Sequence, residues 1–224
     1  MSREHTVRAY SQELDLLKSK VLEMGRECET QLAKAVDALI TIDTRLAQDI
    51  IEGDTQINKL HGKVDDLAVR MLALRQPMAL DLRNIIAAQK IAADFERIAD
   101  YAANIAKYVL DLNKPILESP VKSIVQMIDT GLRMLSDVLV AYQVPDSKKA
   151  REVWHQDKHI DRIYFGLLTK LRTIMIEDSK KINASTRLLF VGRCCERIGD
   201  HIKNVAESVH FIVSGEMHHG NPMQ

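Results

Sequence analysis

The stretch FERIADYAANIA, residues 95–106, returns one hundred positions later as CERIGDHIKNVA, residues 195–206. The two copies share Glu, Arg, Ile, Asp, Asn and Ala in the same order. Because a helix turns about 100° per residue, the acids four positions apart lie on one face, one turn above the other. The chain therefore carries the same helical pattern of acids and apolar residues twice, which indicates an internal duplication.

The duplication extends beyond these copies. Apolar residues recur at spacings of three, four and seven over residues 50–74 and again over residues 153–174, as in helices that pack at shallow angles. Asp43 precedes Asp54 by eleven positions, and Asp146 precedes Asp157 by the same distance. The first aspartate of each pair is placed to cap a helix N-terminus.

Composition and proline positions predict an all-α fold. Aromatic residues make up only 4% of the chain, and the five prolines fall between long stretches of strong helix formers. The expected helices span residues 6–41, 44–75, 78–112, 121–142, 147–177 and 183–214. We predict two sequence-related three-helix bundles, residues 1–113 and 114–224, arranged end to end.

Charge and patterning narrow the functional classes. The 31 basic and 31 acidic residues leave no net charge and no strong basic field, so nucleic acid is not expected as a partner. The N-terminal stretch does not read as a signal peptide, and no uncharged apolar run approaches about 18 residues, which predicts a soluble, cytoplasmic protein. The three cysteines show no CxxC spacing and are expected to pack as small, reduced apolar groups.

The duplicated acids form two polar ladders on the helix side opposite the apolar face. The first consists of Glu96, Asp100 and Asn104, and the second of Glu196, Asp200 and Asn204. Acids one turn apart repel, at a cost of about 0.2–0.5 kcal/mol per pair, and a bound cation would convert this repulsion into ligation. We therefore predict that both ladders lie on the outer surface as candidate metal ligands.

A single helix supplies only part of a coordination shell, so neighbouring helices should complete it. The reinforcing side chains expected across a surface groove are Asp54, Asn58, Asp157 and Asp161. His155, His159 and His201 are further candidate ligands, although a polar helix face explains them equally well. The alternative for the ladders is a solvated face in which Arg97 and Arg197 pair with the acids.

The chain resembles the PhoU family, the accessory regulators of phosphate-specific uptake in bacteria. The resemblance rests on RQPMALDLR (75–83), on GDTQINKL (53–60) and on the two copies that open this section, and it covers essentially the whole chain. It implies two three-helix bundles, a cytoplasmic location and a homodimer. It also implies phosphate homeostasis as the role: a negative regulator of signal transduction that acts between the ATPase subunit of the phosphate ABC importer and a membrane sensor histidine kinase when phosphate is plentiful.

The resemblance further implies metal binding at E/DxxxD motifs, as multinuclear iron or zinc clusters or as manganese or magnesium. By motif match these sites fall on Glu96, Asp100, Glu196 and Asp200, with the remaining ladder and groove residues as additional ligands. The sequence departs from the family pattern at Ala99, where a glycine is usual, and at Cys194 and Cys195, where apolar residues are expected.

Two other functions compete with a non-enzymatic, metal-binding adaptor. A carboxylate-bridged di-iron enzyme or iron store uses Glu-x-x-His elements, which occur at Glu152 with His155 and at Glu207 with His210. The second of these elements is placed on the outward side of its helix, which counts against that function. A purely structural helical scaffold is the third possibility. No P-loop, GxSxG or GxGxxG motif is present in the sequence, which favours a protein that is not an enzyme.

Overall fold

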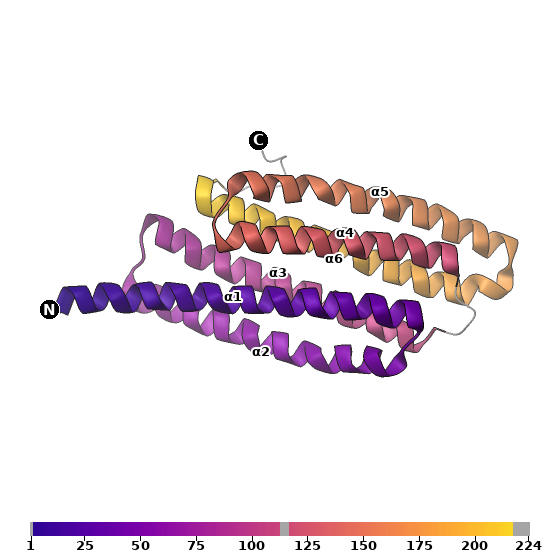
Figure 1. Ribbon diagram of the computed structural model, residues 1–224, viewed down its shortest axis with the longest axis horizontal. Coiled ribbons are helices and arrows are strands. Elements are labelled where there is room, and N and C mark those ends of the chain that lie inside the picture. The colour runs from indigo at the N-terminus through magenta and orange to yellow at the C-terminus, as the bar shows by residue number, and fades with distance from the viewer. Residues whose placement is uncertain (1, 113–116, 217–224) are drawn as a thin grey trace.

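The computed structural model describes residues 2–112 and 117–216, and all regular secondary structure within them is helical (Figure 1). The elements are α1 (Ser2–Thr41), α2 (Thr44–Arg75), α3 (Ala79–Leu110), α4 (Glu118–Gln143), α5 (Ser147–Glu177), the short 3-10 helix η1 (Ser179–Lys181) and α6 (Ile182–Ser214). The all-α fold and the six long helices predicted from the sequence are confirmed, with boundaries that differ by a few residues.

The helix boundaries follow from local capping. The Asp43 carboxylate accepts hydrogen bonds from two backbone N–H groups at the start of α2, and Asp146 does the same at the start of α5. Each aspartate satisfies donors that a helix start otherwise leaves without partners. At the other end of the chain, α6 stops at Gly215, whose φ of 76° lies in the left-handed region.

The apolar stripes predicted for the helices lie mainly in the core. In α3 and α6 the apolar face opposite the ladders is buried. In α2 and α5 the stripes are buried except at Leu67, Ile163 and Ile174, which are half-buried, and at Leu74, which is 69% exposed. All three cysteines are free and buried, and burial raises the pKa of the Cys194 thiol to about 11.

The two three-helix groups lie side by side, and the predicted end-to-end arrangement is wrong. Helix α3 packs against α6, and α1 packs against α4, so one continuous core joins α1–α3 to α4–α6 (Figure 1). Helices α3 and α6 occupy the centre and are buried on more of their surface than α2 and α5, which lie on the flanks. A single apolar stripe per helix does not reveal this second packing face.

A small residue in α1 permits the close approach of the two groups. A Cβ atom at Gly25 would overlap the side chain of Leu139 from α4 and would lie 3.0 Å from the Phe95 ring of α3. Helix α1 therefore contacts both its own group and the other at this point. Loss of the glycine would force these side chains apart.

The predicted division of the chain between residues 113 and 114 lies outside the described residues, and it stays a prediction. None of the helices in residues 2–112 and 117–216 has the length and apolar character needed to cross a bilayer.

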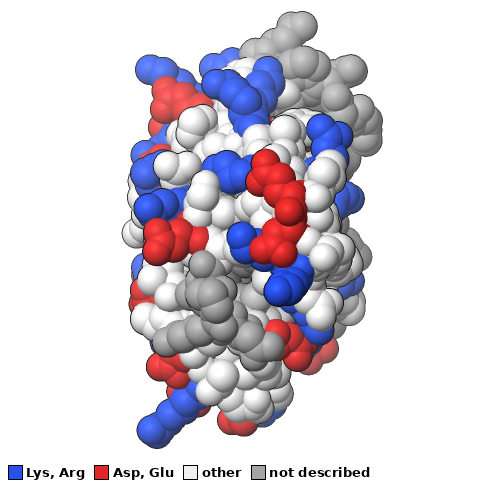
Figure 2. All heavy atoms as spheres, turned by 90° about the vertical axis from the view of Figure 1, so that its right-hand side faces the viewer, with Lys and Arg blue, Asp and Glu red and all other residues white. Residues whose placement is uncertain are grey.

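On the end of the molecule shown in Figure 2, Lys and Arg side chains are interspersed with Asp and Glu. A cavity of about 840 Å³ involves the ends of α3, α5 and α6, and two of the cations that line it, Lys181 and Arg187, pair with Asp178 and Asp111.

Candidate metal centre

The acids of the second ladder lie beside acids of α5 where α5 and α6 pack together, and we refer to this interface as the α5–α6 groove. Asp157 on α5 is only 3% exposed, and the side chain of Glu196 on α6 is 15% exposed. Asp161 and Asp200 are half-buried beside them. We call Asp157, Asp161, Glu196 and Asp200 the α5–α6 cluster. Glu196 and Asp200 point away from the apolar face of α6, as predicted. Helix α5 partly covers them, however, so the prediction that they lie on the outer surface is only partly correct.

The carboxylates of this cluster influence one another electrostatically. Burial raises the pKa of Asp157 to about 6; Lys203 opposes this shift, while the charges of Asp161 and Asp200 add to it. Burial and the neighbouring Asp200 also raise the pKa of Glu196. The groove therefore concentrates negative charge where water solvates it poorly, which is the electrostatic condition that favours a bound cation.

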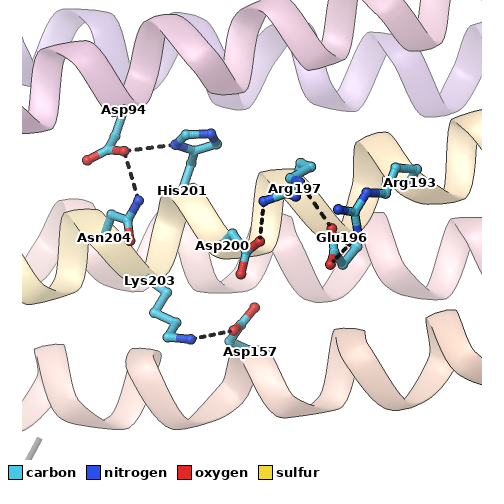
Figure 3. Close-up of polar contacts among 9 residues, drawn as sticks. All are labelled: Asp94, Asp157, Arg193, Glu196, Arg197, Asp200, His201, Lys203 and Asn204. Carbon is cyan, nitrogen blue, oxygen red and sulfur yellow. Dashed lines mark hydrogen bonds and ion pairs between the residues drawn. The ribbon is translucent and has the colours of Figure 1, made fainter. Parts of the chain in front are cut away.

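Basic side chains partly compensate this charge (Figure 3). Arg193 donates to Glu196 at 2.7 Å, Arg197 donates to Asp200 at 3.3 Å, and Lys203 donates to Asp157 at 3.3 Å. The pairing of Arg197 with the ladder acids was expected from the alternative in which the ladders are a solvated face. The two arginines engage one oxygen of Asp200 and mainly one of Glu196, and they do not reach Asp157.

The first ladder meets α2 in the corresponding groove between α2 and α3. Burial raises the pKa of Asp54, and the charge of Asp100 across the groove raises it further. Asn58 donates to Asp54 at 3.0 Å, and Arg97 donates to Asp100 at 3.2 Å. We call Asp54, Asn58, Glu96 and Asp100 the α2–α3 cluster. All of its members are partly or fully exposed, and none is as buried as Asp157 in the α5–α6 cluster.

A residue that the sequence did not single out lies beside the α2–α3 cluster. Gln31 on α1 is only 6% exposed, and its amide nitrogen lies 3.0 Å from where a Cβ would stand on Gly53, next to Asp54 in the chain. Its side-chain oxygen accepts no hydrogen bond. The position of this glutamine within an apolar helix face could have indicated a buried polar contact. The helix that it contacts could not be inferred from the sequence of α1 alone.

The two ladder asparagines have hydrogen-bond partners outside the acidic ladders, and their role as ligands stays a prediction. Asn104 accepts a hydrogen bond from Lys107 on its own helix, at 3.1 Å. Asn204 donates to Asp94 of α3 at 3.2 Å, and His201 contacts the same Asp94 oxygen at 2.8 Å (Figure 3). In Figure 3 these α6 side chains point toward α3, whereas Lys203 points toward α5. His201 and Asn204 therefore link the two three-helix groups.

The donor set of the clusters fits a hard or borderline metal ion, although no complete site is formed. Three buried carboxylate oxygens accept no hydrogen bond, namely Oδ1 of Asp54, Oδ1 of Asp157 and Oε2 of Glu196. Such atoms are rare in folded proteins and indicate a missing partner. Within the described part of the chain, however, no three Asp, Glu, His or Cys side chains gather closely enough to form a metal-binding group. A cation would have to draw the flanking carboxylates together.

The side chains that suggested a di-iron centre are engaged elsewhere. Glu207 accepts a hydrogen bond from the Trp154 indole at 2.8 Å, and His210 contacts the Ser147 hydroxyl at 2.7 Å. The prediction that His210 faces outward is wrong, because it is 6% exposed beside the start of α5. Glu152 and His155 are exposed on the outer side of α5. These contacts give the di-iron alternative no support.

The fold and the paired acidic clusters define a class of helical proteins built from two three-helix repeats. The sequence profile of the PhoU domain family matches this chain twice, over residues 21–109 and residues 124–209. The chain therefore belongs to the PhoU domain family.

Curated relatives and solved structures agree with this assignment. The chain is 41% identical over 214 residues to the phosphate-specific transport system accessory protein PhoU homolog of Caulobacter vibrioides, covering 95% of this chain and 93% of that protein. It is 34% identical over 213 residues to PhoU of Escherichia coli, covering 95% and 88%. The crystal structure of PhoU from Pseudomonas aeruginosa matches with a TM-score of 0.87 at 37% identity, covering 92% of this chain and all of that one.

Another solved relative matches equally well. The crystal structure of the phosphate transport system regulatory protein PhoU from Streptococcus pneumoniae matches with a TM-score of 0.88 at 31% identity. It covers 93% of this chain and 98% of that chain. The resemblance predicted from the sequence motifs is thus confirmed at the level of family and fold.

Proposed function

We propose that this protein is a non-enzymatic accessory regulator of a phosphate-specific transport system. The observation that carries the proposal is the full-length similarity to relatives named as such accessory proteins, the Caulobacter vibrioides protein at 41% identity among them. In this proposal the chain works at the cytoplasmic side of the membrane as a homodimer, associated peripherally with its partners. It links the importer ATPase to a sensor histidine kinase and represses the starvation response when phosphate is plentiful.

The acidic clusters supply the proposed metal-binding function. Asp157, Asp161, Glu196 and Asp200 would hold one cation between α5 and α6, and Asp54, Glu96 and Asp100 would hold another between α2 and α3, with Asn58 adding an amide oxygen. Such a cation supplies positive charge that offsets the repulsion among the carboxylates and joins two helices. Buried oxygens of Asp54, Asp157 and Glu196 support this proposal, because none of the three accepts a hydrogen bond.

Stiffened helix pairs would present a defined surface to the partners. Helices α2 and α5 flank the molecule, and each packs against a central helix, α3 or α6, with its acidic cluster between the two. Charge in these grooves therefore affects how firmly each flanking helix is held. A regulator that acts through its surface needs this property and does not need a catalytic pocket.

A genetic assay tests the regulatory role. In cells that lack this protein and carry a reporter under a phosphate-starvation promoter, the wild-type chain should restore repression in phosphate-rich medium. Co-purification should recover the importer ATPase and the sensor kinase with the chain. Repression that does not depend on the chain would overturn the proposal.

A binding assay tests the metal role separately. Protein stripped with a chelator is titrated with Mn²⁺, and bound metal is followed by electron paramagnetic resonance. Asp54→Asn with Asp100→Asn should remove one binding event, and Asp157→Asn with Asp200→Asn the other. The matched controls on the same flanking helices are Asp66→Asn and Glu152→Gln, both exposed, which should bind as the wild type does. Unchanged binding in the cluster variants would place the metal elsewhere, and no binding by the wild type would favour the purely structural scaffold.

A further inference from the structure

One basic side chain, that of Lys203, pairs with the most buried acid of the α5–α6 cluster. The ammonium nitrogen of Lys203 lies 3.3 Å from Oδ2 of Asp157, a carboxylate that is only 3% exposed. The same nitrogen lies 5.1 Å from the centre of the Trp154 ring, which helps to hold it over the groove. Lys203 thus provides the positive charge nearest to the most buried acid of the cluster (Figure 3).

The first repeat has no lysine at the position that matches Lys203. The position that matches Lys203 is Ala103, which is 3% exposed and carries no charge. The lysine nearest in sequence to the first ladder, Lys107, lies one turn further along α3 and donates to Asn104. Its charge opposes the rise in the pKa of Asp54, but it makes no ion pair with that carboxylate within the described residues. Asp54 therefore receives its hydrogen bond from the neutral amide of Asn58. The two clusters have similar acids but different built-in compensation.

We propose that Lys203 is a tethered cation that fills the α5–α6 cluster, so that a divalent metal ion binds the α2–α3 cluster first and reaches the second cluster only when Lys203 moves away. This inference rests on the proposed metal-binding function. It adds that the two clusters bind metal ions one after the other, and that Lys203 determines which cluster binds first.

The competition follows from charge and from reach. An ammonium group and a divalent cation at the same buried carboxylate repel each other, and the repulsion is strong where water is scarce. Lys203 is 30% exposed in its side chain and has a flexible stem, so it can swing toward solvent without unfolding α6. It engages only Oδ2 of Asp157, while Oδ1 accepts no hydrogen bond. The lysine thus compensates the charge incompletely and can be displaced.

The test isolates the second cluster in the full-length protein. In an Asp54→Asn, Asp100→Asn background, stripped with a chelator, Mn²⁺ is titrated and followed by calorimetry and electron paramagnetic resonance. Lys203→Met keeps the apolar stem against Trp154 and removes the charge, and Lys203→Gln keeps a donor for Asp157. Each should raise Mn²⁺ affinity about tenfold or more, which corresponds to about 1.4 kcal/mol.

Two controls separate this effect from a general loss of positive charge. Lys203→Arg retains the tethered cation and should bind Mn²⁺ as weakly as the parent. Lys158→Met removes another lysine near the Trp154 ring, with its nitrogen 5.9 Å from the ring centre. No ion pair to Asp157 involves it, so it should leave Mn²⁺ affinity unchanged.

Thermal unfolding gives a second readout. Without metal, Lys203→Met should unfold at a lower temperature than the parent, because Asp157 loses its partner, and Mn²⁺ should restore or exceed the parent value. The inference would be overturned if Lys203→Met were less stable and did not respond to Mn²⁺, or if both neutral variants bound Mn²⁺ with unchanged affinity. In either case, Mn²⁺ binding at the α2–α3 cluster of the wild type would leave the proposed metal role intact. No Mn²⁺ binding by any variant or by the wild type would overturn both.

Discussion

The α2–α3 and α5–α6 clusters derive from the same sequence pattern but bury their acids to different depths. Asp157 is 3% exposed, whereas the matching Asp54 is only half-buried. Opposite Asp157 stands Gly199, where a Cβ would lie 2.8 Å from its Oδ1. The matching residue in the first repeat is Ala99, which already carries that methyl group. We infer that this methyl group contributes to the greater exposure of Asp54.

The deeper groove requires more charge compensation. Asp161 in the second cluster replaces the amide of Asn58 in the first, which adds another negative charge beside Asp157. Lys203 supplies the opposing charge, and Ala103 shows that the first cluster needs none at that position. Duplication therefore preserved the ladder while the residues around it diverged, and the burial of the acids differs with them.

The largest contrast between repeats is expected in the core behind the ladders. Phe95→Ala should lower the free energy of unfolding by about 3–5 kcal/mol, because it removes a fully buried aromatic ring that packs near Gly25. The matched change Cys195→Ala removes one sulfur atom and should cost about 1 kcal/mol. Urea denaturation of both variants measures the difference. Equal losses would contradict the view that the core depends more heavily on the first repeat at this position.

Exchanging the residues that set groove depth should have the next largest effect. Gly199→Ala should lower the free energy of unfolding by about 1–3 kcal/mol, since the new methyl group would displace Asp157 and the Ile160 side chain, 3.0 Å away. Ala99→Gly has no such clash and should cost about 0.5–1 kcal/mol through helix propensity. Thermal unfolding in the presence of a chelator compares them. If Ala99→Gly were the more destabilising, groove depth would have another cause.

A smaller effect should be visible in the dependence of stability on pH. The folded-state pKa of Asp157 is about 6 against an ordinary value of 3.8, so the folded state holds a proton there that the unfolded state has lost. Stability of metal-free protein should therefore fall as the pH rises from about 4 to about 6. Asp157→Asn should flatten this part of the profile. Asp54→Asn, the control in the shallower cluster, should change it less.

The smallest expected effect comes from making the first cluster more acidic. Asn58→Asp removes the 3.0 Å hydrogen bond to Asp54 and places a second negative charge one turn away. Without metal this should cost about 0.5–1 kcal/mol of unfolding free energy and raise the pKa of Asp54 further. Mn²⁺ should reverse the loss. The reciprocal Asp161→Asn should stabilise the metal-free protein, and destabilisation would argue that Asp161 has a structural role.

Much of the candidate site could be anticipated because its acids follow a helical period. The positions of Glu196 and Asp200 opposite the apolar face, and the flanking Asp157, follow from spacing and from the expectation of a neighbouring helix. Lys203, Gln31 and the link from Asp94 to His201 could not be anticipated. Each depends on which side of a helix meets which other helix, and periodicity within one helix does not contain that information.

The same division applies to the whole molecule. Helix limits, the caps at Asp43 and Asp146 and the buried stripes depend on interactions within a few turns of chain, so residue order is enough to establish them. The side-by-side packing of the two groups, the depth of each groove and the burial of His210 arose from contacts between distant segments. Such contacts depend on how closely helix surfaces approach, as at Gly25 and Gly199, and this becomes known only when the helices are placed in space.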